Sequence, residues 1–362
     1  MKKNETVLLF TDLIPQQQDY LSVENQRGAN LRCLALLGAE IGKTYCKKLI
    51  YHEYPATGNH GAEPPAAIWE LAFGEKTIES LKKNKLLIPI LRKTAKDHDI
   101  SAAEEIIREK QNSAIDCVIA LSHYSTSHTR FRDFLTRICG CRYASMPLFE
   151  VSMLEGAMRV DWKALAKRTI ALSKTVAKAE YIRITTPNGT QIAFSKKGRK
   201  ALPDTGILTK KGSFGNLPAG EVFLAPVEGT ANGRLVLEWA PTRQLSSPVT
   251  LTVRNGVVTD VSGEDEYARH LHNKLSERAE NRNIAELGIG TNDAAKRPDN
   301  ILESEKILGT IHIALGDNSS FGGKVKTPFH QDFVFFRPTV TLLYKDNSRQ
   351  DILKSGRLLC QP

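Results

Sequence analysis

Apolar residues occur with two different spacings along the first half of the chain. Short apolar runs, which are typical of buried strands, occupy residues 6–10, 48–51, 85–91 and 114–121. Longer segments with apolar residues near helical spacing lie between and after them, at residues 25–42, 66–73, 75–81, 102–110, 130–139 and 161–179. Strands that alternate with helices favour a parallel sheet with helices on its faces. We therefore expect an N-terminal α/β domain with a mostly parallel sheet.

The pattern changes near Glu180, after which strand-like runs dominate. Asn-Gly pairs at 188–189, 232–233 and 255–256 punctuate these runs, and such pairs favour tight hairpins. One helix is expected at 264–280, and the segment 196–215, rich in lysine and glycine, is expected to be an exposed loop. The sequence thus predicts two domains: an α/β domain at 1–180, followed by a β-rich α+β domain at 181–362.

Composition narrows the class of protein. The 362 residues exceed the usual size of a single core, in keeping with two domains. The formal charge is +10 and the pI is near 9.2, but the lysines are spread out without interleaved aromatic residues, so we expect no nucleic-acid partner. No apolar run approaches the roughly 18 residues of a membrane span. The run VLLF near the N-terminus is too short for a signal peptide, and the six cysteines are scattered. We expect a cytoplasmic protein.

Two histidines and an aspartate stand out between residues 302 and 334. His312 lies inside an apolar, strand-like run, and His330 and Asp332 form an H-x-D pair just before another. Residues i and i+2 of a strand point to the same face, so His330 and Asp332 could reach one metal ion. Imidazole and carboxylate groups are common ligands for zinc, cobalt, manganese and iron. The alternative for each histidine is a hydrogen-bonded core or edge residue.

Two glutamates occur in similar apolar settings upstream. Glu286 lies in AELGIGTN, and Glu221 follows a Pro-Ala-Gly turn in NLPAGEVFLAPVEGTANG. A carboxylate in an apolar strand is costly to bury without a partner. That partner is either a metal ion or the side chain of an arginine or lysine, and the sequence leaves both open.

Several motifs together resemble the aminopeptidase T and PepS family of metallo-aminopeptidases. In the second half these are NLPAGEVFLAPVEGTANG, AELGIGTN, NILESEKILGTIHIALGDNSSFGG and the H-x-D pair, in the order and at spacings similar to those of the family. In the first half they are HGAEPP and SHYSTSHTRFRDFLTRICGCRYASMPLF. The resemblance covers most of the chain.

The resemblance implies a metal centre and an activity. The residues that match the family's metal ligands are Glu221, Glu286, His312, His330 and Asp332. Two divalent ions per chain are implied, with a glutamate shared between them, and the expected metals are zinc, cobalt or manganese. The implied enzyme is a cytoplasmic, homodimeric aminopeptidase, a hydrolase that removes N-terminal residues from peptides with a metal-activated water. Glu286 or Glu221 would serve as its catalytic base.

One departure from the family bears on the activity. The peptidases carry a tyrosine a few residues after the first histidine of the metal site, whereas His312 is followed by IALGDNSSFGG, without tyrosine. The gap between His312 and His330 is also short. Ser319 is a candidate substrate-binding residue in place of the tyrosine. The same fold resembles that of iron-dependent dioxygenases that open dihydroxypyridine rings, so the alternative is a mononuclear iron(II) ring-cleaving enzyme acting on a small molecule. A degenerate homologue that only binds a partner is the third interpretation.

His128 and Arg130 are candidate substrate-binding residues. They follow the apolar run that ends at Leu121, and ligands commonly bind where strands of an open α/β sheet end. In the alternative, Ser127 or Thr129 caps the helix that follows. Glu228 is either a further catalytic acid or a turn residue paired with Arg234.

Overall fold

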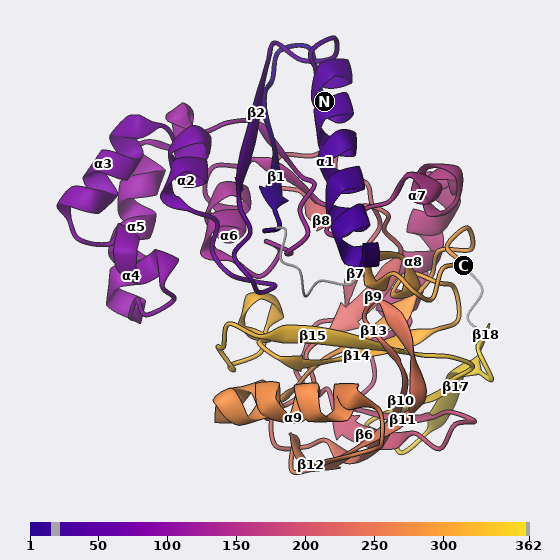
Figure 1. Cartoon of the computed structure of the whole chain (residues 1–362). Helices are drawn as coiled ribbons and strands as arrows, with labels where there is room; N and C mark the ends of the chain where they lie inside the picture. Colours follow the sequence, from indigo (N-terminus) through magenta and orange to yellow (C-terminus); the bar gives the residue numbers. More distant parts are fainter. Residues whose placement is uncertain (16–21, 360–362) are drawn as a thin grey trace. The chain divides into compact units, whose positions relative to one another are not determined.

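The computed structural model describes residues 1–15 and 22–359, which form two compact units (Figure 1). The first comprises Met1–Val151 and Ile207–Leu217, and the second comprises Ser152–Gly206 and Pro218–Pro362. The contacts therefore divide the chain at other positions than Glu180. The expected domains at 1–180 and 181–362 stay a prediction.

The first unit contains a parallel five-stranded sheet of order β2-β1-β3-β4-β8. Its strands are β1 (Thr6–Leu13), β2 (Lys48–Pro55), β3 (Cys117–Ala120), β4 (Arg142–Ser145) and β8 (Phe214–Asn216). Its helices are α1 (Ser22–Gly42), α2 (Ala66–Phe73), α3 (Glu75–Lys83), α4 (Leu87–Leu91), α5 (Asp97–Glu109) and α6 (Arg130–Arg137). The aromatic core around Trp69 packs the sheet against α2 and α6. The expected parallel α/β region is confirmed.

The second unit contains two antiparallel sheets. Strands β5 (Tyr181–Thr185), β6 (Gln191–Ser195), β10 (Asn232–Ala240), β11 (Arg243–Arg254), β12 (Val257–Ser262), β16 (Thr339–Leu343), β17 (Arg349–Lys354) and β18 (Arg357–Leu358) form one of them. The other has the order β15-β14-β13-β9-β7 and consists of β7 (Leu202–Asp204), β9 (Glu221–Leu224), β13 (Ile284–Gly290), β14 (Ile311–Gly316) and β15 (His330–Phe335). The remaining α-helices are α7 (Val151–Glu155), α8 (Trp162–Ala177), α9 (Glu266–Glu277) and α10 (Ile301–Ser304). A single apolar core joins both sheets, which confirms the expected β-rich region.

Two predicted segments are wrong. The run 85–91 is not a strand, because Leu87–Leu91 forms α4. Leu87 and Ile90 are buried while Ile88 is exposed, which is a helical spacing, and Pro89 could not donate to a strand ladder. The segment 196–215 is not only an exposed loop, since it contains β7 and the first two residues of β8 and begins with the buried Lys196. Three-residue strands are too short to show a periodicity, and β8 pairs with a strand far away in sequence.

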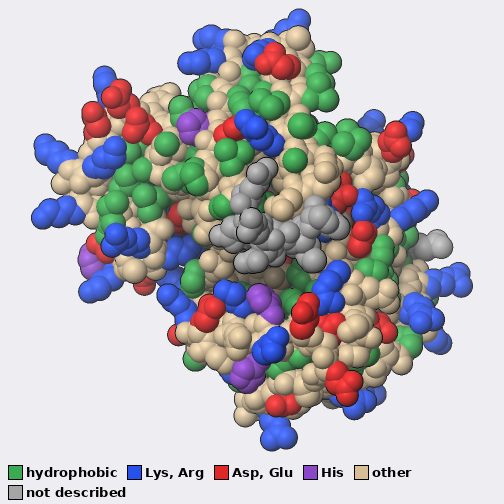
Figure 2. All heavy atoms as spheres, viewed as in Figure 1, with side chains coloured by type: hydrophobic (Ala, Val, Ile, Leu, Met, Phe, Trp, Pro, Cys, Tyr) green, Lys and Arg blue, Asp and Glu red, His purple; other side chains and the backbone are tan. Residues whose placement is uncertain are grey.

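Charged residues are mixed on the surface. Figure 2 shows lysine and arginine side chains scattered over the viewed face among acidic ones. No helix within the described residues is long and apolar enough to cross a membrane. The described cysteines are all free thiols.

Candidate metal centre

The predicted metal ligands all lie on one face of the antiparallel sheet β15-β14-β13-β9-β7. In the antiparallel register Glu286 is opposite Ala314, and Ala314 is opposite Asp332. The other ligands of this face each lie opposite a glycine of a neighbouring strand, in the pairs Glu221–Gly290, His312–Gly288 and His330–Gly316. Because side chains alternate along a strand, these residues project together. The structure thus brings together the five residues proposed from the sequence.

The opposite face of the same strands is part of the apolar core. Leu224, Leu287, Ile313 and Phe333 form one cross-strand row there, and each is at most 1% exposed. Each strand therefore alternates between a core residue and a site residue. This alternation explains why polar ligands occur inside strongly apolar runs.

Small residues make room for the ligands. A Cβ atom added to Gly288 would lie 1.9 Å from Cε1 of His312, far inside van der Waals contact. The imidazole of His312 therefore lies directly over the Gly288 backbone. Alanine or glycine also occupies the positions beside Glu286, Asp332 and His330, so no large side chain from a paired position competes with these polar groups for space.

Glu286 is the residue that connects the two histidines. Its Oε1 lies 3.4 Å from Nε2 of His312, and its Oε2 lies 3.5 Å from Nε2 of His330. Glu221 Oε2 approaches His312 Nε2 at 3.3 Å, and Asp332 Oδ1 approaches His330 Nε2 at 3.6 Å. Glu221, Glu286 and His312 each offer a ligand atom within 4.8 Å of the others. A carboxylate with one oxygen toward each imidazole is a suitable central ligand for a cation.

Burial and charge alter the protonation of these groups in the metal-free protein. Burial by itself would lower the pKa of His312, but the hydrogen bond to Glu286 and the charge of Glu221 raise this pKa to about 9. Burial likewise opposes protonation of His330, yet Asp332 and Glu286 raise its pKa to about 10. Burial raises the pKa of Glu286 above its usual value. The surplus of buried carboxylates therefore holds protons on the imidazoles, and a metal ion would have to displace them.

The orientation of His330 is set by the loop before β15. Nδ1 of His330 lies 2.7 Å from the carbonyl oxygen of Asp317. A carbonyl oxygen can only accept, so Nδ1 is the donor and Nε2 points toward the carboxylates. A hydrogen bond of this kind fixes the ring orientation of metal-binding histidines.

The donor set fits a divalent metal ion. Glu221 Oε2 and His312 Nδ1 are buried and lack a hydrogen-bond partner within the described part of the chain. Imidazole nitrogens and carboxylate oxygens are donors that iron, zinc and manganese accept. The five predicted residues offer such donors, and those of Glu221, Glu286 and His312 lie within 4.8 Å of one another.

Sequence reasoning missed one member of this cluster, Lys306. Its side chain is fully buried, and Nζ donates to Glu221 Oε1 at 2.7 Å and to Glu305 Oε2 at 2.9 Å. Glu221 therefore has the lysine partner that was the alternative to a metal, while its second oxygen faces His312. The neighbouring acid and lysine in ESEK were the available signal, but nothing in the sequence showed that both turn inward.

The loop between β14 and β15 is held by its own polar side chains. Ser319 was expected to bind substrate, and its Oγ donates to the carboxylate of Asp317. The backbone N–H groups of Ser319 and Thr327 donate to the same carboxylate. Phe321, in this loop, packs edge-on against His330 with ring centroids 6.1 Å apart, and against Phe223 at 5.7 Å. An aromatic wall therefore adjoins His330.

His128 and Arg130 lie in the first unit, in the loop between β3 and α6 and at the start of α6. The Oγ1 of Thr129, between them, accepts from the backbone N of Arg132, so Thr129 caps α6 as the alternative proposed. The carbonyl of His128 accepts from Lys93 Nζ, and the backbone N of Arg130 donates to the buried Glu63. These bonds use backbone atoms and leave the substrate-binding role of both side chains a prediction.

The expected pair Glu228–Arg234 does not form. Glu228 instead pairs with Arg199 and accepts from Asn318 Nδ2 and the backbone N of Lys324. Arg234 Nε donates to the carbonyl of Gly189. Glu228 thus anchors the loop between β14 and β15 from outside.

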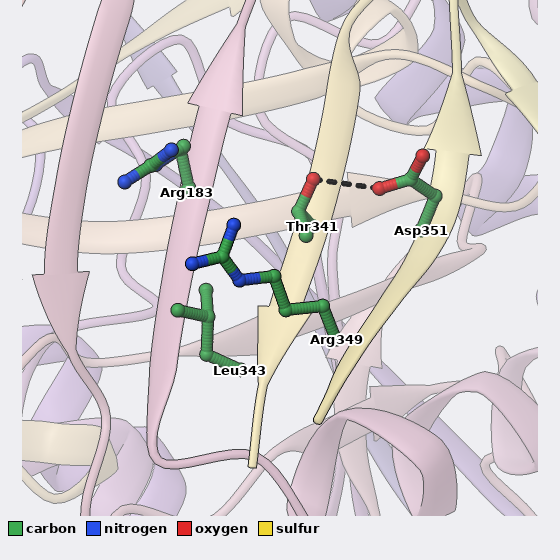
Figure 3. Close-up of a pocket in the computed structure, with 5 residues that line it drawn as sticks. All are labelled: Arg183, Thr341, Leu343, Arg349 and Asp351. Carbon is green, nitrogen blue, oxygen red and sulfur yellow. Dashed lines mark hydrogen bonds between the residues drawn. The ribbon is translucent and has the colours of Figure 1, made fainter. Parts of the chain in front are cut away.

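A separate pocket lies on the eight-stranded sheet. Figure 3 shows that β5, β16 and β17 provide its lining side chains, which are Arg183, Thr341, Leu343, Arg349 and Asp351. Thr341 Oγ1 donates to Asp351 Oδ1 at 2.7 Å. None of the predicted site residues lines this pocket.

Comparison with known proteins decides the family. The model of the NicX family, described as 2,5-dihydroxypyridine 5,6-dioxygenase, matches residues 91–359 of this chain, which is well over half of it. The chain belongs to the NicX family. The match includes all five predicted metal ligands.

One characterised relative and two solved structures extend the comparison. The 2,5-dihydroxypyridine 5,6-dioxygenase of Pseudomonas putida is 25% identical over 182 residues, which cover 46% of this chain and 52% of that protein. The chain thus spans about half the length of this relative. The structure of the dioxygenase from P. putida KT2440 has a TM-score of 0.64 at 18% identity and covers 99% of this chain and 92% of that chain. AmpT from Thermus thermophilus has a TM-score of 0.55 at 15% identity and covers 99% and 95%. At these identities the two structures establish the fold alone.

NicX membership corrects the expected enzyme class. The expectation of a hydrolase, aminopeptidase, metallopeptidase or protease is wrong, because the family match is to a dioxygenase. The fold shared with AmpT explains the error, since a shared fold does not define the reaction. The missing tyrosine after His312 was the signal against a peptidase. The family is described by an enzyme, and Glu221, Glu286 and His312 could hold a metal ion, so the expected metal centre remains a proposal.

Proposed function

We propose that this protein is an iron(II)-dependent dioxygenase that opens the ring of a dihydroxylated pyridine. The observation that carries the proposal is that the NicX match spans the sheet face on which His312, His330, Asp332 and Glu286 converge. Two histidines with a carboxylate form the usual ligand set of non-haem iron(II) oxygenases. The proposed centre holds one iron ion, with Glu286 facing both imidazoles.

Iron(II) held there would supply the redox chemistry that lets molecular oxygen react with an aromatic ring. In 2,5-dihydroxypyridine, breaking the bond between C5 and C6 and adding one oxygen atom to each carbon leaves a carboxylic acid at C5 and a formyl group on nitrogen. Both atoms of oxygen enter the product, so no outside reductant is consumed.

The protein's own groups have two further tasks in this proposal. Glu221 Oε2 faces His312 Nε2 at 3.3 Å and has no hydrogen-bond partner within the described residues, and we propose that it takes the proton of a substrate hydroxyl as the catalytic base. Phe321 and Phe223 form an aromatic wall next to His330 that would exclude water and pack against a flat ring.

The test uses protein loaded with iron(II) under anaerobic conditions and then mixed with oxygenated 2,5-dihydroxypyridine. We expect one oxygen molecule to be consumed for each ring lost, and both atoms of ¹⁸O₂ to appear in the product. Zinc-loaded protein is the matched control and should consume no oxygen. Folded, iron-loaded protein that leaves the ring intact would rule the proposal out.

Three features expected from the sequence remain proposals. We propose that the protein is a cytoplasmic homodimer, and sedimentation at micromolar concentration that gives the mass of one chain would contradict the dimer.

His128 and Arg130 are proposed to bind the substrate. Replacing His128 with alanine should raise KM more than it lowers kcat, and an unchanged KM would remove it from this role.

A further inference from the structure

Lys306 is a fixed positive charge inside the metal-ligand cluster. None of its side chain is exposed, and Nζ bonds to Glu221 Oε1 and Glu305 Oε2. Asp204 lies opposite Glu221 on β7 and brings a further carboxylate to this end of the cluster. Removing one partner of a buried ion pair costs folding free energy, so these carboxylates hold the Lys306 ammonium in place.

The two ends of the cluster are therefore different. At one end, Glu221 uses Oε1 to bind Lys306 and has only Oε2 left to face His312. At the other end, oxygens of Glu286 and Asp332 both face Nε2 of His330. From His312 to this second end, two imidazoles and two carboxylates follow one another at 3.4 to 3.6 Å, whereas Glu221 shares its carboxylate with Lys306.

We propose that Lys306 occupies the place of a second metal ion and so restricts the cluster to one divalent ion. This proposal rests on the proposed function for the existence of a metal site, but it concerns how many ions bind and which residues bind them. The single ion is held by the histidines with Glu286 and Asp332, and Glu221 stays outside its coordination as a carboxylate that can accept a proton.

The physical basis is competition for one carboxylate. A second divalent ion beside Glu221 would have to share this carboxylate with the ammonium only 2.7 Å from Oε1. In a buried site, repulsion between a divalent ion and a neighbouring ammonium weakens binding of that ion by on the order of 100-fold or more. Replacing Lys306 with a neutral residue removes the repulsion and releases Oε1 of Glu221.

The experiment counts metal ions on wild type and on Lys306→Gln. Manganese(II) and cobalt(II) are titrated by equilibrium dialysis with elemental analysis, and spin coupling between adjacent manganese ions is read by electron paramagnetic resonance. Wild type should saturate at one ion per chain without spin coupling. Lys306→Gln should bind a second ion on the order of 100-fold more tightly than wild type does, with spin coupling. Adding Glu221→Gln to this variant should abolish the second site.

Lys196→Gln is the matched control. Lys196 is also buried in the second unit, but its Nζ donates to the carbonyls of Ala177 and Ala179 rather than to carboxylates. This variant should lose stability yet keep one metal ion. A purely structural role for Lys306 would give the same pattern in both lysine variants.

Two results would overturn the proposal. One is a wild-type protein that binds two ions with similar affinity. This result does not depend on the folding of any variant. The other is a Lys306→Gln protein with a native circular dichroism spectrum that still saturates at one ion. Oxygen uptake is measured separately, so a protein that binds one ion but does not open rings would refute the proposed function and leave the role of Lys306 standing.

Discussion

The imidazole of His312 rests on the backbone of Gly288, across the pair of strands β13 and β14. The two residues are direct partners in the antiparallel register, and a Cβ atom on Gly288 would lie 1.9 Å from Cε1 and 2.1 Å from Nε2 of the ring. The glycine therefore determines where Nε2 of His312 is placed relative to Glu286 and Glu221. The missing side chain of Gly288 leaves space for the imidazole ring, and the glycine needs no bond to a metal ion for this role.

Gly288→Ala should displace His312 and weaken metal binding by about 10- to 100-fold, the range seen when groups that orient metal ligands are changed. Metal affinity by competitive chelator titration checks this result. Gly38→Ala is the control, because a Cβ there makes only ordinary contacts of 3.5 Å or more and alanine favours a helix. Unchanged affinity in Gly288→Ala would show that the ring can move aside without loss.

His330→Ala and Asp332→Ala should each strongly reduce the metal content of the purified protein, because each removes a group that faces the cation position. Elemental analysis of dialysed samples gives the result directly. His270→Ala is the control, since this exposed histidine on α9 lies in an H-x-H pair whose side chains diverge on a helix. If both site variants keep full occupancy, the ligand assignment is wrong.

Metal-free protein should lose stability as the pH rises from neutral. The folded pKa values of His312 and His330, about 9 and 10, exceed the usual unfolded value of 6.5. These histidines bind more protons when folded, so their contribution is fully present below about pH 6.5 and is lost as the pH rises through about 9 to 10. Urea unfolding at several pH values measures this trend.

Metal affinity should show the opposite dependence on pH, because ions compete with the protons on the two imidazoles. The variant His312→Gln, which lacks one of these protons, should flatten both curves. A free energy of unfolding for the metal-free protein that increases between pH 7 and pH 10 would contradict the assigned protonation.

Asp317→Ala should disturb the site more than Ser319→Ala does. The Asp317 carboxylate holds the backbone N–H groups of Ser319 and Thr327, and its carbonyl accepts from His330. Loss of the carboxylate should loosen this loop and weaken metal binding by about tenfold. Ser319→Ala removes only a hydroxyl that donates to Asp317, so its metal affinity should stay near that of wild type. Equal effects of the two variants would mean that the carboxylate does not organise the loop.

The sequence placed the five candidate ligands on strands because strand alternation is a local property, while their role as metal ligands stays a prediction. His330 and Asp332 are two residues apart, and each of the five predicted residues lies in an apolar run that becomes a buried strand. Their convergence follows from strand pairing, which no local pattern specifies, and the family resemblance supplied it. The helical α4 was missed because a short apolar run fits a buried helix as well as a strand.

Other features depended on contacts between residues far apart in sequence. Lys306 and Glu221 are separated by 85 positions, and β8 joins a sheet whose other strands end at Ser145. The reaction class was mistaken for a different reason. The ligands that define a metal site are common to hydrolases and oxygenases, so they indicate a metal without indicating what it does.

Along the strands of the antiparallel sheet β15-β14-β13-β9-β7, successive side chains alternate between two faces with different roles. Residues on one face belong to the apolar core, and those between them on the other face are the candidate metal ligands. Selection for folding and selection for catalysis therefore act on alternate residues of the same strands. A lineage can exchange one reaction for another by changing every second residue, while the interior that it inherited remains intact.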